Sequence, residues 1–192
     1  MREHYVNEMN NFIGGWYFDD TSICDEIIEY HKNSDDKFQG FVASTRIDTT
    51  IKKSTDVWLN HNQTLNGKYN KLLQSVLEEY MVKYPYCNHY SAFNNLEPTF
   101  IQHYDKGEGF YAWHTERTGS NEPFHSRHLV YMTYLNDVSD DGETEFFHQE
   151  LKVKPEKGLT LIWPADWTFT HRGITSKTEE KYITTGWFNY YA

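Results

Sequence analysis

Short stretches of alternating apolar and polar residues follow one another after residue 98, and they limit the possible folds more than any other feature. Among them are TFIQHY, GFYAWHTE, RHLVYMTYLND, GLTLIW and KYITTGWFNYY, separated by turn-forming segments such as DKGEG, SDDG and PEKG. Alternation with a period of two is typical of half-buried strands. Many short strands between tight turns indicate a barrel or a double-sheet jelly roll.

Two helices are expected ahead of these strands. Residues 19–33 have Asp20 or Thr21 as a cap and isoleucines at helical spacing, and residues 64–85 show a similar apolar pattern that ends at Pro85. We therefore expect an α+β fold, with a double-stranded β-helix (jelly-roll) core and N-terminal helices packed on one side. A chain of 192 residues without repeats or linker-like segments is expected to form a single domain over residues 1–192, with a helical and supporting region of about 1–97 and a jelly-roll core of about 98–192.

Charge and cysteine content exclude some classes of protein. The formal net charge of -10 argues against nucleic acid and against an anionic membrane as partners, because both require a basic surface. The two cysteines, Cys24 and Cys87, imply no disulfide framework and are expected to be free, buried thiols in a reducing compartment. No segment resembles a signal peptide or a membrane span, so a soluble, cytoplasmic protein is expected.

The stretch WHTERTG contains the first residues with an evident chemical function. His114 and Glu116 would point to the same side of a strand if residues 109–116 are extended. His171, in FTHRG, is the candidate for a third ligand from a distant strand. Two histidines and one carboxylate are the ligand set of non-haem Fe(II) oxygenases. A His-x-Glu pair is also found as a simple polar pair on an exposed strand, so the spacing alone leaves both interpretations open.

Lys181 is the second candidate, at the start of the alternating strand KYITTGWF. A lysine that points into a barrel is costly unless an anion meets it, and the far carboxylate of a dicarboxylic co-substrate would be such an anion. The alternative is a solvated lysine at a strand edge, beside Glu179 and Glu180.

Six segments in a fixed order carry a resemblance to a known family. The series QHYDKGEGFYAWHTE, RHLVYMTYLND, DGETEFF, VKPEKGLTLIWP, THRG and KYITTGW resembles the prolyl 4-hydroxylase-like branch of the Fe(II)- and 2-oxoglutarate-dependent oxygenases, over about residues 99–190. The resemblance implies that His114, Glu116 and His171 form the catalytic iron site and that Lys181 pairs with the distal carboxylate of 2-oxoglutarate. It further implies co-substrate or pocket roles for Tyr104, Tyr134, Thr185 and Trp187.

One ligand departs from the family pattern, which usually has His-x-Asp where this chain has His-x-Glu. Glutamate carries one more methylene, so the carboxylate of Glu116 must fold back to reach the same position. The iron geometry, the affinity or the metal preference is therefore expected to differ from that of the aspartate enzymes.

The resemblance also implies an activity. We expect a dioxygenase that hydroxylates a C–H bond of a peptidyl residue, with proline as the first candidate, or of a small amino-acid-like substrate. Fe(II) and 2-oxoglutarate would be the cofactors, ascorbate an additional reductant, and succinate and carbon dioxide the co-products. The protein is expected to be a monomer or homodimer without nucleic-acid or membrane partners. The alternatives are a cupin-type metalloenzyme that does not use 2-oxoglutarate and a non-catalytic jelly-roll binding module.

Two polar segments, residues 44–56 and 117–127, are expected to cover the mouth of the pocket and to select the substrate. The remaining histidines receive less specific roles. His103 is expected to face away from the site, His148 to be exposed, and His125 and His128 to lie on the surface or just behind the ligands. Arg127 and Arg172 could each bind a substrate carboxylate or pair with nearby acids, and the sequence leaves both roles open.

Overall fold

The computed structural model describes residues 1–5, 11–42 and 46–191. Two α-helices, α1 (Ser22–Asn33) and α2 (Gln63–Lys83), lie in the N-terminal half. The strands are β1 (Arg2–His4), β2 (Gly14–Tyr17), β3 (Phe38–Gln39), β4 (Thr55–Trp58), β5 (Phe93–Asn94), β6 (Phe100–Tyr104), β7 (Arg127–Tyr134), β8 (Thr144–Phe146), β9 (Leu151–Val153), β10 (Leu159–Pro164), β11 (His171–Gly173) and β12 (Lys181–Tyr190). Short 3-10 turns are η1 (Leu59–His61), η2 (Pro85–Asn88), η3 (Phe124–Ser126) and η4 (Trp167–Phe169).

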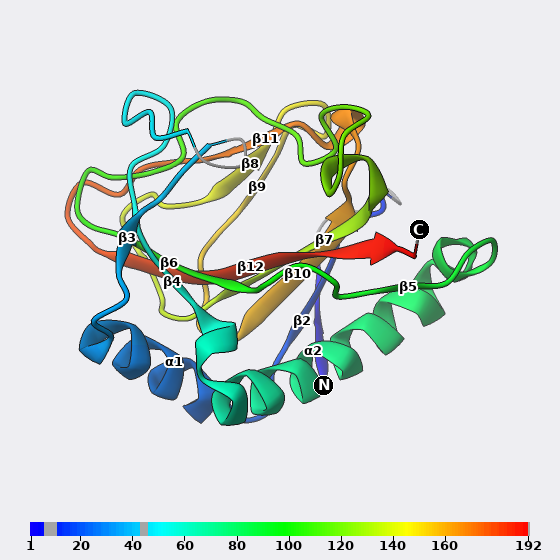
Figure 1. Cartoon of the computed structure of the whole chain (residues 1–192), viewed down its shortest axis with the longest axis horizontal. Helices are drawn as coiled ribbons and strands as arrows, with labels where there is room; N and C mark the ends of the chain where they lie inside the picture. The colour runs from blue at the N-terminus through cyan, green and yellow to red at the C-terminus, as the bar shows by residue number, and fades with distance from the viewer. Residues whose placement is uncertain (6–10, 43–45, 192) are drawn as a thin grey trace.

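The strands form two sheets. The large sheet has the order β1-β2-β10-β7-β12-β6-β4-β3, with β5 also paired to β12, and the small sheet has the order β11-β8-β9. Figure 1 shows α1 and α2 on one side of the large sheet and the small sheet on the other. This three-layer arrangement gives the large sheet two different faces, one toward the helices and one toward the small sheet.

Local signals explain where both helices begin and end. The Asn62 side chain caps α2 by accepting a hydrogen bond from the Leu65 amide at 3.1 Å. Thr21 occupies the corresponding position before α1 without a side-chain cap, while Asp20 accepts from the Ser22 amide at 2.9 Å. Pro85 begins η2 just after α2 ends, as expected from its missing amide proton.

Alternation along the central strands separates two apolar clusters. On β7, Leu129 and Tyr131 pack with the helix residues, whereas Val130, Met132 and Tyr134 pack in the cluster between the two sheets. The same period of two applies to β6 and β12, because successive side chains of a strand point to opposite faces. The face toward the small sheet is therefore the one on which a pocket can form.

The expected strand over residues 109–116 is wrong. This segment forms only isolated bridges, Lys52 to Phe110 and His114 to His171, and bends at Glu116. It is tied instead to the end of β10, since both the Arg117 amide and the Thr115 hydroxyl donate to the Ala165 carbonyl at 3.0 Å. A segment held by a few separate hydrogen bonds can bend, whereas continuous backbone pairing with a neighbouring strand would keep it extended.

Two further expectations concern the cysteines and the membrane. Cys24 is buried and free, as expected, while Cys87 is free but only half-buried. In the ranges 1–5, 11–42 and 46–191, no helix combines the length and the apolar character needed to cross a membrane.

Candidate active site

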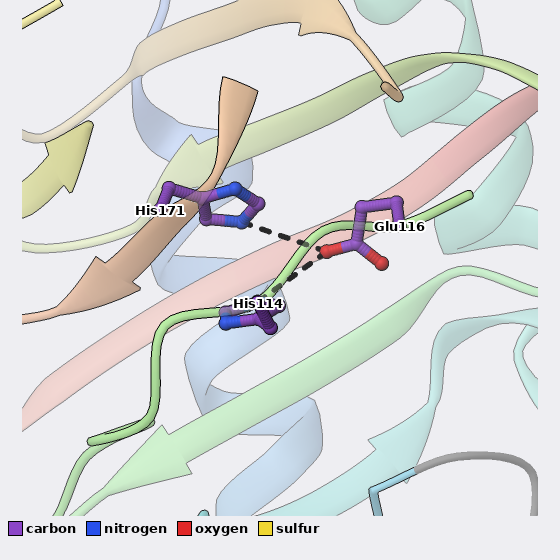
Figure 2. Close-up of side chains that lie close together, drawn as sticks. All are labelled: His114, Glu116 and His171. Carbon is purple, nitrogen blue, oxygen red and sulfur yellow. Dashed lines mark ion pairs between the residues drawn. The ribbon is translucent and has the colours of Figure 1, made fainter. Parts of the chain in front are cut away.

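His114, Glu116 and His171 converge although they come from different parts of the chain (Figure 2). His171 opens β11, and its backbone pairs with that of His114 through two hydrogen bonds of 2.9 and 3.0 Å. Glu116 Oε1 lies 3.5 Å from Nε2 of both histidines. One ligand atom from each residue lies within 4.8 Å of the other two, which is a spacing that one metal ion can bridge.

The protonation of the two histidines fits a metal site. The Nδ1 atom of His114 lies 3.1 Å from the Ala112 carbonyl, and that of His171 lies 2.9 Å from the Phe169 carbonyl. A carbonyl only accepts, so each Nδ1 carries a proton, and Nε2 is the ring nitrogen that each histidine turns toward Glu116. Metal-binding histidines are commonly oriented in this way by a backbone carbonyl.

The charges at this site also favour a bound cation. Burial lowers the pKa of His114, and the neighbouring His171 lowers it further, so the imidazole is neutral and able to bind a metal. Burial acts to raise the pKa of Glu116, but hydrogen bonds with His114 and His171 outweigh it and hold this pKa well below its ordinary value. Two imidazoles around an ionised carboxylate are a donor set that suits Fe(II).

The second carboxylate oxygen of Glu116 is held from the opposite side. The Trp187 indole Nε1 donates to Glu116 Oε2 at 3.0 Å, and Arg127 Nη1 lies 3.4 Å from the same oxygen. Arg127 is itself fixed by two hydrogen bonds to the Glu97 carboxylate, of 2.8 and 2.6 Å, and its guanidinium lies 3.5 Å from the centre of the Trp187 ring. Trp187 thus contacts the candidate metal ligand directly, and Oε1 is left to face the histidines.

Lys181 points into the same cavity from the start of β12. It is 6% exposed, its Nζ donates to the Gly142 carbonyl at 2.8 Å, and within the described part of the chain it has no ion-pair partner. Burial lowers the pKa of Lys181 to about 8, against a smaller opposing effect of Glu143. A buried ammonium group with a single carbonyl acceptor is well suited to bind an anion.

The other predicted residues line this cavity too. The Tyr104 hydroxyl donates to Gln102 Oε1 at 2.8 Å, the Tyr134 hydroxyl lies 2.7 Å from Thr144 Oγ1, and the Thr185 hydroxyl donates to a backbone carbonyl at 3.1 Å. Burial raises the pKa of both tyrosines, so both stay protonated and can donate to a ligand. All eight candidate side chains face one space.

The cavity has a volume of about 660 Å³. Both segments expected at its mouth contribute to the lining: Arg46, Ile51 and Lys52 come from residues 44–56, of which 44 and 45 lie outside the described residues, and Thr118, Pro123, Phe124 and Arg127 come from residues 117–127. Both segments thus contribute to the wall of the cavity that contains the candidate metal site.

Some residues of the site carried no clear signal in the sequence. Gln102 shares the cavity face of β6 with Tyr104, and the period of two could have identified it. Glu97 precedes that strand and had no such signal. Lys52 is buried in the cavity wall in an ion pair with Asp56, at 2.9 Å.

His103, His125 and His148 lie where they were expected, whereas His128 lies neither on the surface nor behind the ligands but against the Cys87 carbonyl and the Tyr190 ring. His103 faces the helix side, where it stacks on Tyr182 and pairs with Glu180. His125 and His148 are exposed, and His128 is half-buried. Arg172 lies at the cavity mouth and pairs with Glu145 at 2.8 Å.

Comparison with known proteins gives this geometry a context. Residues 99–189 match the model of the 2OG-Fe(II) oxygenase superfamily. No curated protein matches the chain in sequence.

Solved structures share the fold over nearly the whole chain. The viral collagen prolyl hydroxylase of Paramecium Bursaria Chlorella virus-1, in its 2-oxoglutarate complex, is 19% identical, with a TM-score of 0.68 over 95% of this chain and 98% of that chain. A Pseudomonas putida prolyl-4-hydroxylase is 16% identical, with a TM-score of 0.68 over 94% of both chains. A Trichoplax adhaerens prolyl hydroxylase, in complex with a hypoxia inducible factor peptide fragment, is 17% identical, with a TM-score of 0.74 over 94% of this chain and 84% of that chain.

At these identities the structures establish the fold, that of the prolyl hydroxylases, while the family match covers every candidate site residue. The cofactors that follow from the family are Fe(II) and 2-oxoglutarate, and the His-Glu-His triad is a site that could bind the iron. Residues 99–189, just under half of the chain, match the 2OG-Fe(II) oxygenase superfamily, and this match identifies a 2-oxoglutarate-dependent iron dioxygenase.

Proposed function

We propose that this enzyme hydroxylates a carbon atom of a peptidyl residue, with proline as the first candidate. The observation that carries the metal assignment is the convergence of His114, Glu116 and His171, with both Nδ1 atoms on backbone carbonyls. When bound, Fe(II) and 2-oxoglutarate supply the oxidation: one oxygen atom of dioxygen enters the substrate C–H bond, and the other leaves in succinate as carbon dioxide is released.

The protein's part in the metal site is orientation. The two carbonyls keep both imidazoles in the tautomer that leaves Nε2 free, and Trp187 with Arg127 keeps the Glu116 carboxylate from rotating. We assign the ligand roles to His114 Nε2, His171 Nε2 and Glu116 Oε1.

Lys181 is assigned to the distal carboxylate of 2-oxoglutarate. An anion that enters the cavity would keep Lys181 protonated, since an opposite charge favours the charged form of a lysine. The protonated Tyr104 and Tyr134 lie on the same face of the large sheet and can donate to the same carboxylate. In this assignment 2-oxoglutarate has a single orientation in the cavity, with its distal carboxylate at Lys181 and the two tyrosines.

The substrate is assigned to the aromatic side of the cavity. Phe41, Trp58, Phe100, Phe124 and Trp187 line this side, and the rings of Trp58 and Phe100 lie 4.0 Å apart between centroids. Flat aromatic faces bind an apolar ring such as that of proline and exclude water from the reacting carbon. The complex of the Trichoplax enzyme with a peptide fragment supports a peptide in preference to a free amino acid.

The metal and co-substrate assignments are tested together under anaerobic conditions. Fe(II) and 2-oxoglutarate are titrated into the protein, and the visible charge-transfer band of the chelated pair is followed. The band should be lost in Glu116→Ala and should require much higher 2-oxoglutarate in Lys181→Ala, while Lys71→Ala, an exposed position on α2, should match the wild type. If Lys181→Ala forms the band at the same 2-oxoglutarate concentration as the wild type, the co-substrate does not use this lysine.

The substrate assignment is tested by mass spectrometry after aerobic turnover. A peptide with one proline should gain one oxygen atom in step with succinate release, and the matched peptide with alanine in that position should not. Equal succinate with both peptides and no peptide product would contradict peptidyl-proline hydroxylation while leaving the cofactor assignment intact.

A further inference from the structure

Large aromatic side chains form a continuous exposed row beside the cavity mouth. The row consists of Trp113, Phe147, His148 and Trp167; Trp113 is 37% exposed, Phe147 55% and Trp167 65%, and His148 is exposed as well. Single exposed aromatic residues are common on soluble proteins, but a contiguous group usually marks a surface that binds something.

Each ring of the aromatic row contacts the next edge to face. The centroids of Trp113 and Phe147 lie 5.1 Å apart, those of Phe147 and His148 5.2 Å, and those of His148 and Trp167 5.6 Å, with interplanar angles between 81° and 87°. Edge-to-face rings stabilise one another, and Phe147 and Trp167 remain more than half exposed. The row is therefore a defined surface and not a set of independent side chains.

The backbone beneath the aromatic row is tied to the metal centre. Trp113 directly precedes His114, and Trp167 begins η4, which leads into His171. The Phe147 amide donates to the Thr170 carbonyl at 2.9 Å, where β8 and β11 lie side by side (Figure 1). The position of the row relative to the candidate iron ligands is thus fixed by the chain itself.

The aromatic row is continuous with the cavity. Trp113 belongs to the row and to the cavity lining, and Arg172, also in the lining, lies 4.3 Å from the centre of the Trp113 ring. Phe147, His148 and Trp167 extend the same surface away from the cavity. A ligand that fills the cavity and continues past Trp113 would meet these rings next.

We propose that the aromatic row binds an extended, proline-bearing flank of the peptide whose reacting residue occupies the cavity. This inference rests on the proposed function, since it requires a peptide substrate. Exposed tryptophan and phenylalanine faces recognise polyproline II segments, which are already ordered and lose little entropy on binding.

The test compares two substrates that share one reacting residue. The short one is an acetylated tripeptide amide centred on proline; the long one adds a proline-rich flank, about ten residues in all, enough to reach roughly 30 Å when extended. Binding to the protein loaded anaerobically with Fe(II) and 2-oxoglutarate is measured by fluorescence anisotropy, and turnover by succinate release.

Two variants remove rings that lie outside the cavity lining, Trp167→Ala and Phe147→Ala, and the matched control is Tyr90→Ala, an exposed ring elsewhere on the molecule. Trp167→Ala should weaken binding of the long peptide about tenfold, because tryptophans in an interface are commonly binding hot spots. The short peptide should bind and react as it does with the wild type, and Tyr90→Ala should change neither peptide.

Other outcomes would overturn the proposal. Equal affinity of the wild type for both peptides, or equal loss for both in Trp167→Ala, would show that the aromatic row does not hold a substrate flank. A wild type that dimerises in sedimentation velocity and becomes monomeric in both variants would assign the row to self-association. Turnover of the short peptide separates these results from a failure of the proposed function, in which neither peptide would be hydroxylated.

Discussion

Trp187→Phe isolates the hydrogen bond that fixes the Glu116 carboxylate. The substitution removes the indole N–H that donates to Glu116 Oε2 at 3.0 Å and keeps an aromatic face beneath the Arg127 guanidinium. A hydrogen bond to a charged group contributes about 1.5–3 kcal/mol. Arg127 Nη1, at 3.4 Å from the same oxygen, can close in and compensate in part, which places the expected loss near the lower value.

A loss of about 1.5 kcal/mol corresponds to a roughly tenfold weaker metal affinity, because 1.4 kcal/mol is a factor of ten. Loss of such outer hydrogen bonds typically weakens metal binding 10- to 100-fold. The assay is calorimetric titration of the metal-free protein with Mn(II), an oxygen-stable replacement for Fe(II), so that no turnover enters the measurement.

The chain offers a matched control in Trp163→Phe. Trp163 also lines the cavity and packs against His171, but its indole nitrogen has no hydrogen-bond partner among the described residues. This variant loses the same N–H and the same ring volume, and its Mn(II) affinity should stay within about twofold of the wild type, since no hydrogen bond is removed. The reasoning is refuted if both variants lose affinity equally or if Trp187→Phe binds Mn(II) as well as the wild type.

Three other measurements address charge, ligand length and the core. Because burial lowers the pKa of Lys181 to about 8, the lysine is protonated below that pH and loses its proton above it, so the Kd of 2-oxoglutarate should be flat below pH 8 and rise about tenfold per unit above it; Lys181→Arg should remove the dependence. Glu116→Asp should weaken Mn(II) binding, since a shorter side chain cannot reach both the histidines and the Trp187 N–H. Tyr69→Phe removes a buried hydroxyl between Thr133 and Thr184, at 2.9 and 2.8 Å, and should lower the free energy of unfolding in urea by about 1–3 kcal/mol.

Periodicity accounts for the parts of the site that lie on regular strands, although Thr185 and Trp187 were expected there only from the family resemblance. Lys181, Thr185 and Trp187 share one face of β12, because a strand repeats every two residues, and the cavity lies on that face. The pair of His114 and Glu116 also converges, but for a different reason than expected, since a bend pinned to Ala165 replaces the strand. Local spacing contains no information on such tertiary hydrogen bonds.

The remaining parts of the site depend on contacts between distant segments. His171 reaches His114 through a bridge across 57 positions, which the spacing alone could not establish and which the family resemblance implied. Glu97 acts through Arg127, 30 positions later, and precedes β6 in an irregular segment. No periodic pattern marks a residue of this kind, so the network behind the carboxylate became visible only in three dimensions.

Strand β12 lies between β6 and β7 and pairs with both, and its side chains alternate between the cavity and the helix-side core. Its amide hydrogens should therefore exchange with solvent only when the whole sheet opens, which makes the floor of the site one of the slowest-exchanging parts of the molecule. A shift of the β12 register by one residue relative to β6 would turn Lys181 away from the cavity and place Tyr182 there instead. The cavity side chains of β12 are thus held by the same hydrogen-bonded register as the core of the protein.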